Sequence, residues 1–216
     1  MTWTVHIANA QNQFSELVEP IQHAIEGARR RCERALEPLP IDVVVLAVPG
    51  RVIPERGYVG YAPTGTMMQL TFDPSNSNLI ACLGETLERT VAHEFHHVMR
   101  WRGPGYGRTL GEALVSEGLA GRFVEHLYGA PPEPWEDALS DEDLTDLAVL
   151  AAAWWTTSDY DHGKWFFGQH DYPRWAGYTL GYRLVGQYLA DHPDETAASL
   201  VDTSASQFRA GLSKFH

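Results

Sequence analysis

The spacing of apolar residues changes along the chain, from strand-like near the N-terminus to helical further on. Residues 2–8 alternate weakly between polar and apolar side chains, which predicts a strand. Residues 14–36 carry apolar side chains at helical spacing and gather arginines toward the end, where cations suit the helix dipole. Residues 41–48 form a continuous β-branched run that ends at Pro49-Gly50, which is typical of a buried strand.

Residues 57–72 predict a β-hairpin, because glycine and proline interrupt two short apolar stretches. From residue 78 onward the apolar spacing is helical. Ser140 is an expected helix N-cap, and the aromatic tract at residues 159–168 is expected to be irregular. The expected helices cover residues 83–101, 110–128 and 141–155, and a further helix opens within residues 173–183.

These elements together predict an α+β fold, with a small N-terminal mixed sheet and helix followed by a mainly helical half. We expect residues 1–80 to form the α/β portion, with the hairpin at the edge of the sheet. Residues 81–216 are expected to form the helical portion, and the two portions to make one compact domain of two lobes. A chain of 216 residues is long enough to bury a substantial core.

The chemistry of the sequence is concentrated in the motif H-E-x-x-H at residues 93–97. Two histidines four residues apart on a helix lie about 40° apart around its axis, so His93 and His97 can bind one Zn²⁺. Zinc lowers the pKa of a bound water toward about 7, and Glu94 is placed to take its proton as a general base. This is the chemistry of peptide-bond hydrolysis.

A catalytic zinc needs a third protein ligand, and the next expected helix offers two glutamates. Glu117 follows His97 by 20 residues, a separation over which a turn and an antiparallel helix return a carboxylate to the histidine pair. Glu112 is the alternative, but five residues of helix rotate by about 500°, so both glutamates cannot face the metal. Small residues follow Glu117 and permit close helix contact, so we favour Glu117. We expect Glu112 to be a first-turn acid favoured by the helix dipole, with support of a metal ligand as its alternative role.

With these residues the sequence resembles the gluzincins, zinc peptidases whose ligands are the two motif histidines and a downstream glutamate. More narrowly, the blocks HEFHH, LGEALVSEGLA and PRWAGYTLGYRLV resemble a bacterial family of predicted zinc-dependent proteases of unknown function. The resemblance implies a zincin-like helical half, with His93, His97 and Glu117 as zinc ligands and Glu94 as general base. Thermolysin-like enzymes carry an aspartate four residues after the glutamate ligand, where this chain has Gly121, so another group must orient the ligands here.

The resemblance also suggests roles for a strand and a tyrosine. In gluzincins an edge strand beside the zinc helix pairs with extended substrate, so Met67–Phe72 is a hypothetical substrate strand, with ordinary core packing as the alternative. The developing oxyanion needs a donor besides zinc, and several gluzincins use a tyrosine. Tyr178 is our candidate, with Tyr182, His162 and His170 as alternatives, and core packing of the tyrosines is the competing interpretation.

Composition narrows the classes of partner. The net charge of -12 and the pI near 5.2 argue against nucleic acid or an anionic membrane as the main partner. No apolar run approaches the length of a membrane span, and the first residues lack the features of a signal peptide. Cys32 and Cys82 lack C-x-x-C spacing, which favours reduced thiols and a cytoplasmic location.

The sequence therefore predicts a zinc-dependent metallopeptidase that acts on a peptide or protein substrate. The alternative from another class is a zinc-binding chaperone-like or interaction protein without turnover. Structural zinc sites normally have four ligands, often cysteine, whereas three ligands are apparent here and a glutamate stands where a base belongs. A zinc hydrolase that cleaves a non-peptide amide is a further alternative.

Overall fold

The computed structural model describes residues 3–169 and 171–215 of the chain. The chain forms two compact units, Met1–Trp101 and Arg102–His216, each with its own packed elements. Among the described residues, no helix is both long and apolar enough to cross a bilayer. Both cysteines are free, in agreement with the expected reduced thiols, and Cys32 is buried.

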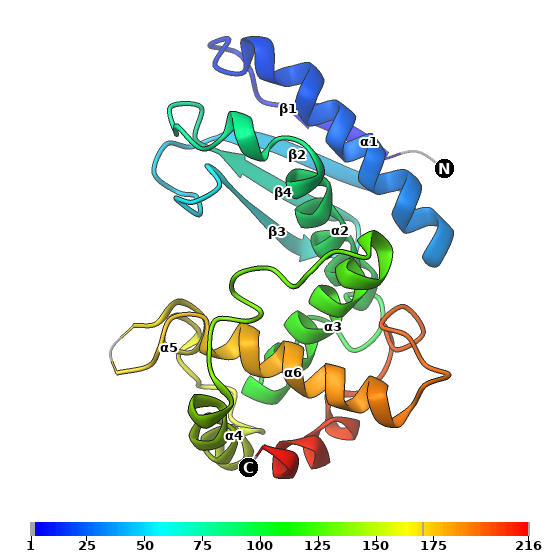
Figure 1. The fold of residues 1–216 in the computed structure, drawn as a ribbon. Helices are drawn as coiled ribbons and strands as arrows, with labels where there is room; N and C mark the ends of the chain where they lie inside the picture. The colour runs from blue at the N-terminus through cyan, green and yellow to red at the C-terminus, as the bar shows by residue number, and fades with distance from the viewer. Residues whose placement is uncertain (1–2, 170, 216) are drawn as a thin grey trace. The chain divides into compact units, whose positions relative to one another are not determined.

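The first unit is built on a four-stranded sheet with the strand order β1-β2-β4-β3 (Figure 1). β1, β2 and β4 run parallel, and β3 pairs with β4 in the antiparallel sense. The small mixed sheet and the helices of the rest of the chain confirm the predicted α+β class. The strands are β1 (Trp3–Ile7), β2 (Ile41–Ala47), β3 (Tyr58–Thr64) and β4 (Met67–Phe72).

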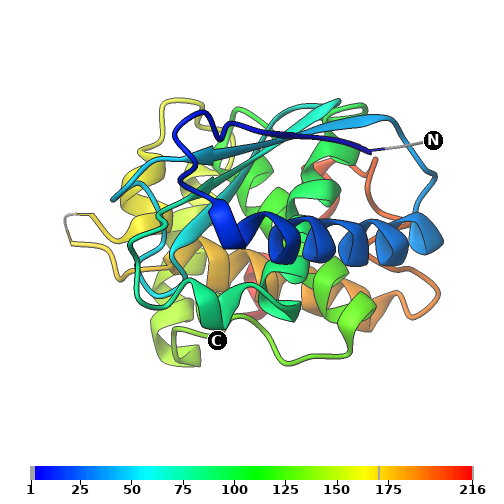
Figure 2. The same cartoon turned by 90° about the horizontal axis from the view of Figure 1, so that it is seen from above.

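Helices α1 (Val18–Ala35) and α2 (Glu85–Arg100) lie against each other on one face of this sheet (Figures 1 and 2). The strands place alternate side chains on that face, and Val43 and Leu70 are fully buried there. On the opposite face, exposed His6 pairs with Asp42 at 2.7 Å. The sheet therefore has an apolar face that packs on the helices and a more polar face on its other side. This pattern is typical of sheets with one face exposed to solvent.

The structure differs from the expectation about which arm of the hairpin, β3 or β4, lies at the edge of the sheet. β4 pairs with β2 on one side and with β3 on the other, so it lies inside the sheet. The hairpin lies at the edge of the sheet as predicted, but through β3. The hypothesis that Met67–Phe72 is an edge strand open to substrate is therefore wrong, and its alternative, ordinary core packing, describes this arm. The physical reason is composition: β4 is apolar and largely buried, whereas β3 contains Gly60 and Pro63, and a proline cannot donate to a ladder. β3 takes the edge instead.

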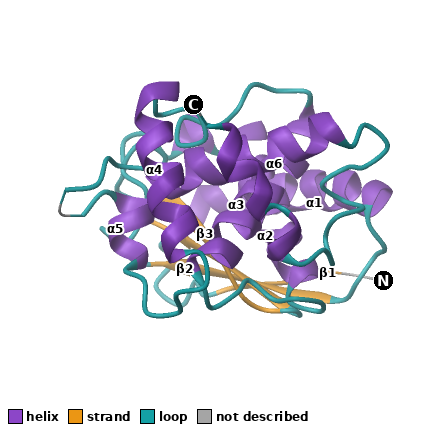
Figure 3. Ribbon diagram, turned by 90° about the horizontal axis from the view of Figure 1, so that it is seen from below, coloured by secondary structure: helices purple, strands orange, loops and turns teal. Residues whose placement is uncertain are grey.

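The second unit is helical (Figure 3). Ser140 caps its helix as predicted, because its side chain accepts a hydrogen bond from Asp143 N. The aromatic tract expected to be irregular contains a short helix, which Asp161 caps through Lys164 N at 2.9 Å. The helices are α3 (Leu110–Tyr128), α4 (Asp141–Trp154), α5 (His162–Phe167) and α6 (Ala176–Asp191).

Two glycines let α3 and α6 pack backbone to backbone. An ideal Cβ at Gly118 would lie 2.2 Å from the carbonyl oxygen of Gly181, and one at Gly181 would lie 2.2 Å from that of Leu114. Real Cβ atoms do not approach that closely, so both positions require glycine. Gly118, the small residue directly after Glu117, is therefore needed for the contact between α3 and α6. This contact holds in place the part of α3 that carries Glu117.

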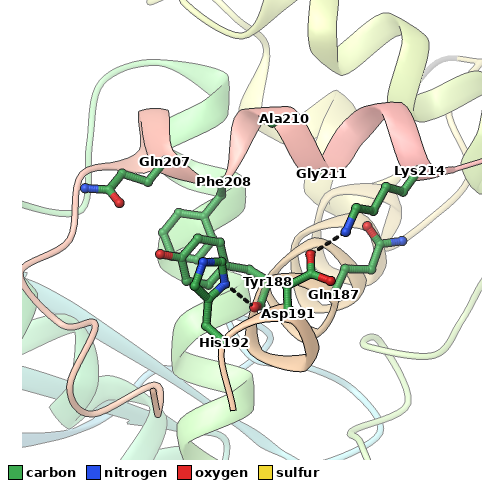
Figure 4. A pocket seen from close by; sticks show the side chains of 9 residues that line it. All are labelled: Gln187, Tyr188, Asp191, His192, Gln207, Phe208, Ala210, Gly211 and Lys214. Carbon is green, nitrogen blue, oxygen red and sulfur yellow. Dashed lines mark hydrogen bonds and ion pairs between the residues drawn. The ribbon is translucent and has the colours of Figure 1, made fainter. Parts of the chain in front are cut away.

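The C-terminal segment folds back onto α6. A 3₁₀ helix, Arg209–Lys214, follows Phe208, whose ring lies 4.4 Å from that of Tyr188, and Tyr188 stacks on His192 at 4.1 Å (Figure 4). Lys214 forms an ion pair with Asp191. These contacts hold the segment in place beside α4 and α6.

Candidate functional site

α2 carries the H-E-x-x-H motif beside an apolar stripe that packs on the sheet. Leu87, Val91 and Phe95 are fully buried, because residues three and four apart share one side of a helix. His93 and His97 form the neighbouring stripe. Their Nε2 atoms lie 3.0 Å apart and their ring planes stand at 80°. The structure therefore brings the two predicted histidine ligands together within the first unit.

The separation of the two histidine nitrogens fits two ligands of one zinc ion. Zn–N bonds of about 2.0–2.1 Å at a tetrahedral angle place two nitrogens roughly 3.3 Å apart. The observed 3.0 Å is close to that value. The same distance fits a hydrogen bond between two neutral rings, which a bound metal would replace. Both converging atoms are Nε2, so each Nδ1 remains on the outer side of its ring, where ligand histidines normally donate an orienting hydrogen bond.

Glu94, the predicted base, lies against the edge strand β3. It is 7% exposed. An ideal Cβ at Gly60 would lie 2.5 Å from Glu94 Cγ and 2.6 Å from its Oε1. The Glu94 side chain therefore fills the space that any larger residue at position 60 would need. Gly60 thus fixes where the carboxylate lies, a link that the hairpin pattern alone did not reveal.

Gly60→Ala tests this link. We expect the added methyl group to displace the Glu94 carboxylate and to slow any reaction in which Glu94 takes part by about 10–100-fold, because a shift of about 1 Å in a reacting group can cost about 100-fold. A crystal structure of the variant measures the displacement. A Glu94 side chain that keeps its place in Gly60→Ala would contradict the assigned contact.

In the second unit, Glu117 is buried on α3, and its carboxylate is held by a tyrosine. The hydroxyl of Tyr106 donates to Glu117 Oε1 at 2.7 Å. Burial raises the pKa of Tyr106 well above 10, and the nearby Glu117 charge raises it further. Tyr106 therefore stays protonated and remains a donor. A carboxylate has two oxygens, so one can accept this bond while the other binds a metal.

Tyr106 was not among the residues predicted from the sequence. It lies in the glycine-rich turn between α2 and α3, which the sequence marks only as a break between helices. The available signal was an aromatic residue with a hydroxyl between two glycines, Gly105 and Gly107. Nothing in its spacing indicates that the turn folds back to Glu117.

Glu112 has the structural role expected of a first-turn acid. Its side chain accepts from the backbone of Thr109 at 2.9 Å and of Arg108 at 2.8 Å. Thr109 in turn accepts from Glu112 N, which completes a capping box at the start of α3. The carboxylate of Glu112 thus satisfies backbone donors at the helix start, whereas Glu117 lies more than one turn further along.

Tyr178, the predicted oxyanion donor, is connected to Tyr106 by a series of ring contacts. The ring of Tyr106 lies 6.3 Å from that of His162, and His162 stacks on Phe166 at 4.4 Å. The ring of Tyr178 packs edge-on against Phe166 at 5.0 Å and Trp175 at 5.7 Å. The second unit therefore brings Glu117, Tyr106 and Tyr178 into one neighbourhood.

The alternatives to Tyr178 lie in different surroundings. Tyr182 stacks under the guanidinium of Arg122 at 3.6 Å and is 4% exposed, so its ring serves the packing of α6 on α3. His162 lies closer to the site, because its ring is 6.3 Å from that of Tyr106. Burial lowers the pKa of His162, while the Glu117 charge acts in the opposite direction. Its Nδ1 lies 3.2 Å from the hydroxyl of Tyr160. His170 lies outside the described residues.

Gly121 occupies the position where the resemblance to thermolysin-like enzymes implies an aspartate, and the structure shows what surrounds it. An ideal Cβ there would lie 2.2 Å from Glu136 Oε1. Glu136 is buried and accepts a hydrogen bond from Glu133 N at 2.7 Å. A side chain at position 121 would require the Glu136 carboxylate, which the loop between α3 and α4 brings to this place, to move.

Comparison with models of known protein families gives a match over most of the chain. Residues 21–210 match the model of a protein family described as "Predicted Zn-dependent protease (DUF2268)". This range includes both motif histidines, Glu94, Glu117 and Tyr178. No curated protein and no solved structure matches the chain.

Proposed function

Because the chain belongs to the family of predicted Zn-dependent proteases, DUF2268, we propose that it is a metallopeptidase of the gluzincin type that hydrolyses peptide bonds. The observation that carries this proposal is the convergence of His93 and His97, with Nε2 atoms 3.0 Å apart, beside the buried carboxylate of Glu94. A histidine pair with a purely structural role does not require a carboxylate such as that of Glu94 beside it. A hydrolase requires one, because a base must take a proton from water.

The proposed zinc ligands are His93, His97 and Glu117, each of which offers one ligand atom. His₂Glu is an established set for catalytic zinc and leaves one position open. The hydrogen bond from Tyr106 supports the choice of Glu117, because ligating carboxylates are usually oriented by a donor of this kind. Capping by Glu112 supports the same choice, since its carboxylate is used at the helix start.

Zinc bound there would lower the pKa of a water and polarise a peptide carbonyl. The residues of the chain would then move the protons. Glu94 accepts a proton from the attacking water and delivers it to the leaving amine. Tyr178 donates a hydrogen bond to the oxygen on which negative charge develops. Burial of Glu94 suits this role, because a carboxylate away from bulk water holds a fixed orientation.

We further propose that the substrate backbone pairs with β3 rather than with β4. β3 is the edge strand, and no other named strand of the described residues pairs with its outer side. Tyr58 there bridges to Ile53, and the carbonyl of Ala62 accepts from Trp101 Nε1 at 2.7 Å, so the proposed pairing is centred on Gly60 between them. The same strand carries Gly60, against which Glu94 packs. Extended peptide added to such an edge gains backbone hydrogen bonds and lies near the base.

Metal-dependent turnover tests the proposed function. The purified protein should cleave a denatured protein or a mixed peptide library, and a chelator should abolish cleavage. Stoichiometric zinc should restore it. A protein that binds one zinc ion but cleaves nothing in the library would favour the non-catalytic alternative, a zinc-binding interaction protein. Cleavage that is insensitive to chelators would reject metal catalysis.

The hydrogen bond from Tyr106 predicts a measurable effect on zinc affinity. Tyr106→Phe removes only the hydroxyl, so we expect the zinc Kd to rise about 10–100-fold, as for other residues that orient a metal ligand. Competition with a chromophoric chelator measures this Kd. Tyr172→Phe is a matched control, because it removes a hydroxyl from the same unit and Tyr172 packs on Trp165. Equal zinc affinity in both variants would contradict the role of Tyr106.

A further inference from the structure

The outward face of α4 exposes a stripe of apolar side chains. Val149 is 67% exposed, Trp154 is 47% exposed and Leu150 is 39% exposed, and Ala153 is exposed beside them. These residues lie on one side of the helix, within an arc of roughly 140°. Large apolar side chains gathered in this way on a surface mark an interaction site more often than isolated ones do.

A groove beside this stripe extends the apolar surface. It is an open depression of about 570 Å³ between α4 and the C-terminal 3₁₀ helix. Ala148, Ala152 and Leu212 are among the residues that line it. The 3₁₀ helix is held to α6 by Lys214–Asp191, so the groove has a wall tied to the core of the unit.

Charge is distributed unequally along the same face. Glu142 and Asp146 are exposed near the start of α4, in line with the apolar stripe. Arg209 lies at the other end, where its guanidinium donates to the carbonyl oxygen of Ala152 at 3.2 Å. Within the described part of the chain, none of these three charged side chains has an ion-pair partner. The face is therefore acidic at one end, apolar in the middle and basic at the other end.

We propose that this face binds the same face of a second copy of the chain, with the two α4 helices antiparallel about a two-fold axis. A face with opposite charges at its two ends is complementary to itself when turned around. With the axis near Val149 and Leu150, Asp146 of one copy lies opposite Ala153 of the other. Arg209, which is bound beside Ala152, then faces the acidic end of its partner. An isologous contact of this kind closes as a dimer.

The apolar stripe and the charges set the expected affinity. Burial of Trp154 and Val149 favours association, and a buried tryptophan is a frequent hot spot. The net charge of -12 on each copy opposes it. One helix face and one groove form a small interface, so we expect a dimer with a Kd of roughly 10–100 µM.

Sedimentation velocity of the full chain, over about 1–200 µM, tests the dimer. We expect Trp154→Glu to raise the Kd by about 30-fold or more, so that the protein stays monomeric. Ile80→Glu is the matched control, because Ile80 is 68% exposed and belongs to the first unit, whereas the proposed interface belongs to the second. Circular dichroism verifies that each variant is folded. A wild type that is monomeric at every concentration, or a dimer that Trp154→Glu leaves unchanged, would overturn the proposal.

A charge exchange tests the antiparallel arrangement. Asp146→Arg changes the net charge from -12 to -10 (-12 + 2), which lowers the general repulsion, yet we expect it to weaken the dimer about tenfold. Arg209→Asp should weaken it as well. The double variant Asp146→Arg/Arg209→Asp keeps the net charge at -12 and should restore the wild-type Kd. Two weakened single variants whose combination does not recover would overturn the pairing of opposite ends.

Discussion

Glu94→Gln is expected to abolish peptide hydrolysis while zinc stays bound. Glutamine has nearly the same shape as glutamate, so the packing against Gly60 is kept. It cannot accept a proton from water, and loss of a general base typically costs about 10²–10⁴ in rate. We therefore expect kcat to fall by about a thousandfold or more, with a zinc content equal to that of the wild type. Single-turnover cleavage assays and metal analysis of the same preparation measure both quantities.

Glu85→Gln is the matched control for this experiment. Glu85 lies in the first turn of the same helix and is exposed, so the same chemical change should leave kcat unchanged. Full activity of Glu94→Gln would reject Glu94 as the base. Loss of activity together with loss of zinc would indicate a role in metal binding instead.

Glu117→Ala is expected to lose most of its zinc. Two histidines alone leave a catalytic zinc without its third protein ligand, so affinity should fall by several orders of magnitude and hydrolysis with it. Mass spectrometry of the purified variant under native conditions counts the bound metal. Removal of the carboxylate also deprives the Tyr106 hydroxyl of its acceptor, so the folded fraction must be measured by circular dichroism.

Glu112→Ala separates the two glutamates of α3. It removes the capping box, which costs about 0.5–2 kcal/mol of stability, but the folded protein should keep its zinc. Equal zinc in the wild type and in Glu117→Ala would reject Glu117 as a ligand. Loss of zinc in folded Glu112→Ala would reverse the assignment of the two residues.

The histidine pair could be predicted from the sequence because its geometry is local. Four residues of helix determine how His93 and His97 project, and the buried stripe of Val91 and Phe95 determines which side of α2 faces the sheet. The capping roles of Ser140 and Glu112 are local in the same sense. Each of these features depends on neighbours within one turn of helix.

The strand order and the contacts of the turn could not be predicted in the same way. Both arms of the hairpin have strand-like composition, and which arm is the edge depends on how β4 pairs with β2, a contact made across more than twenty residues of sequence. The bond from Tyr106 to Glu117 depends on the path of a glycine-rich turn. Gly60 and Gly118 are informative only once the side chain or backbone opposite each of them is known.

X-ray absorption spectroscopy at the zinc edge tests the central claim most directly. The account predicts one zinc per chain, with imidazole nitrogens and oxygens at about 2.0–2.1 Å and no sulfur ligand, and an oxygen from solvent that an added hydroxamate displaces. A sulfur shell at about 2.3 Å, or a fourth protein ligand that a hydroxamate fails to displace, would contradict it.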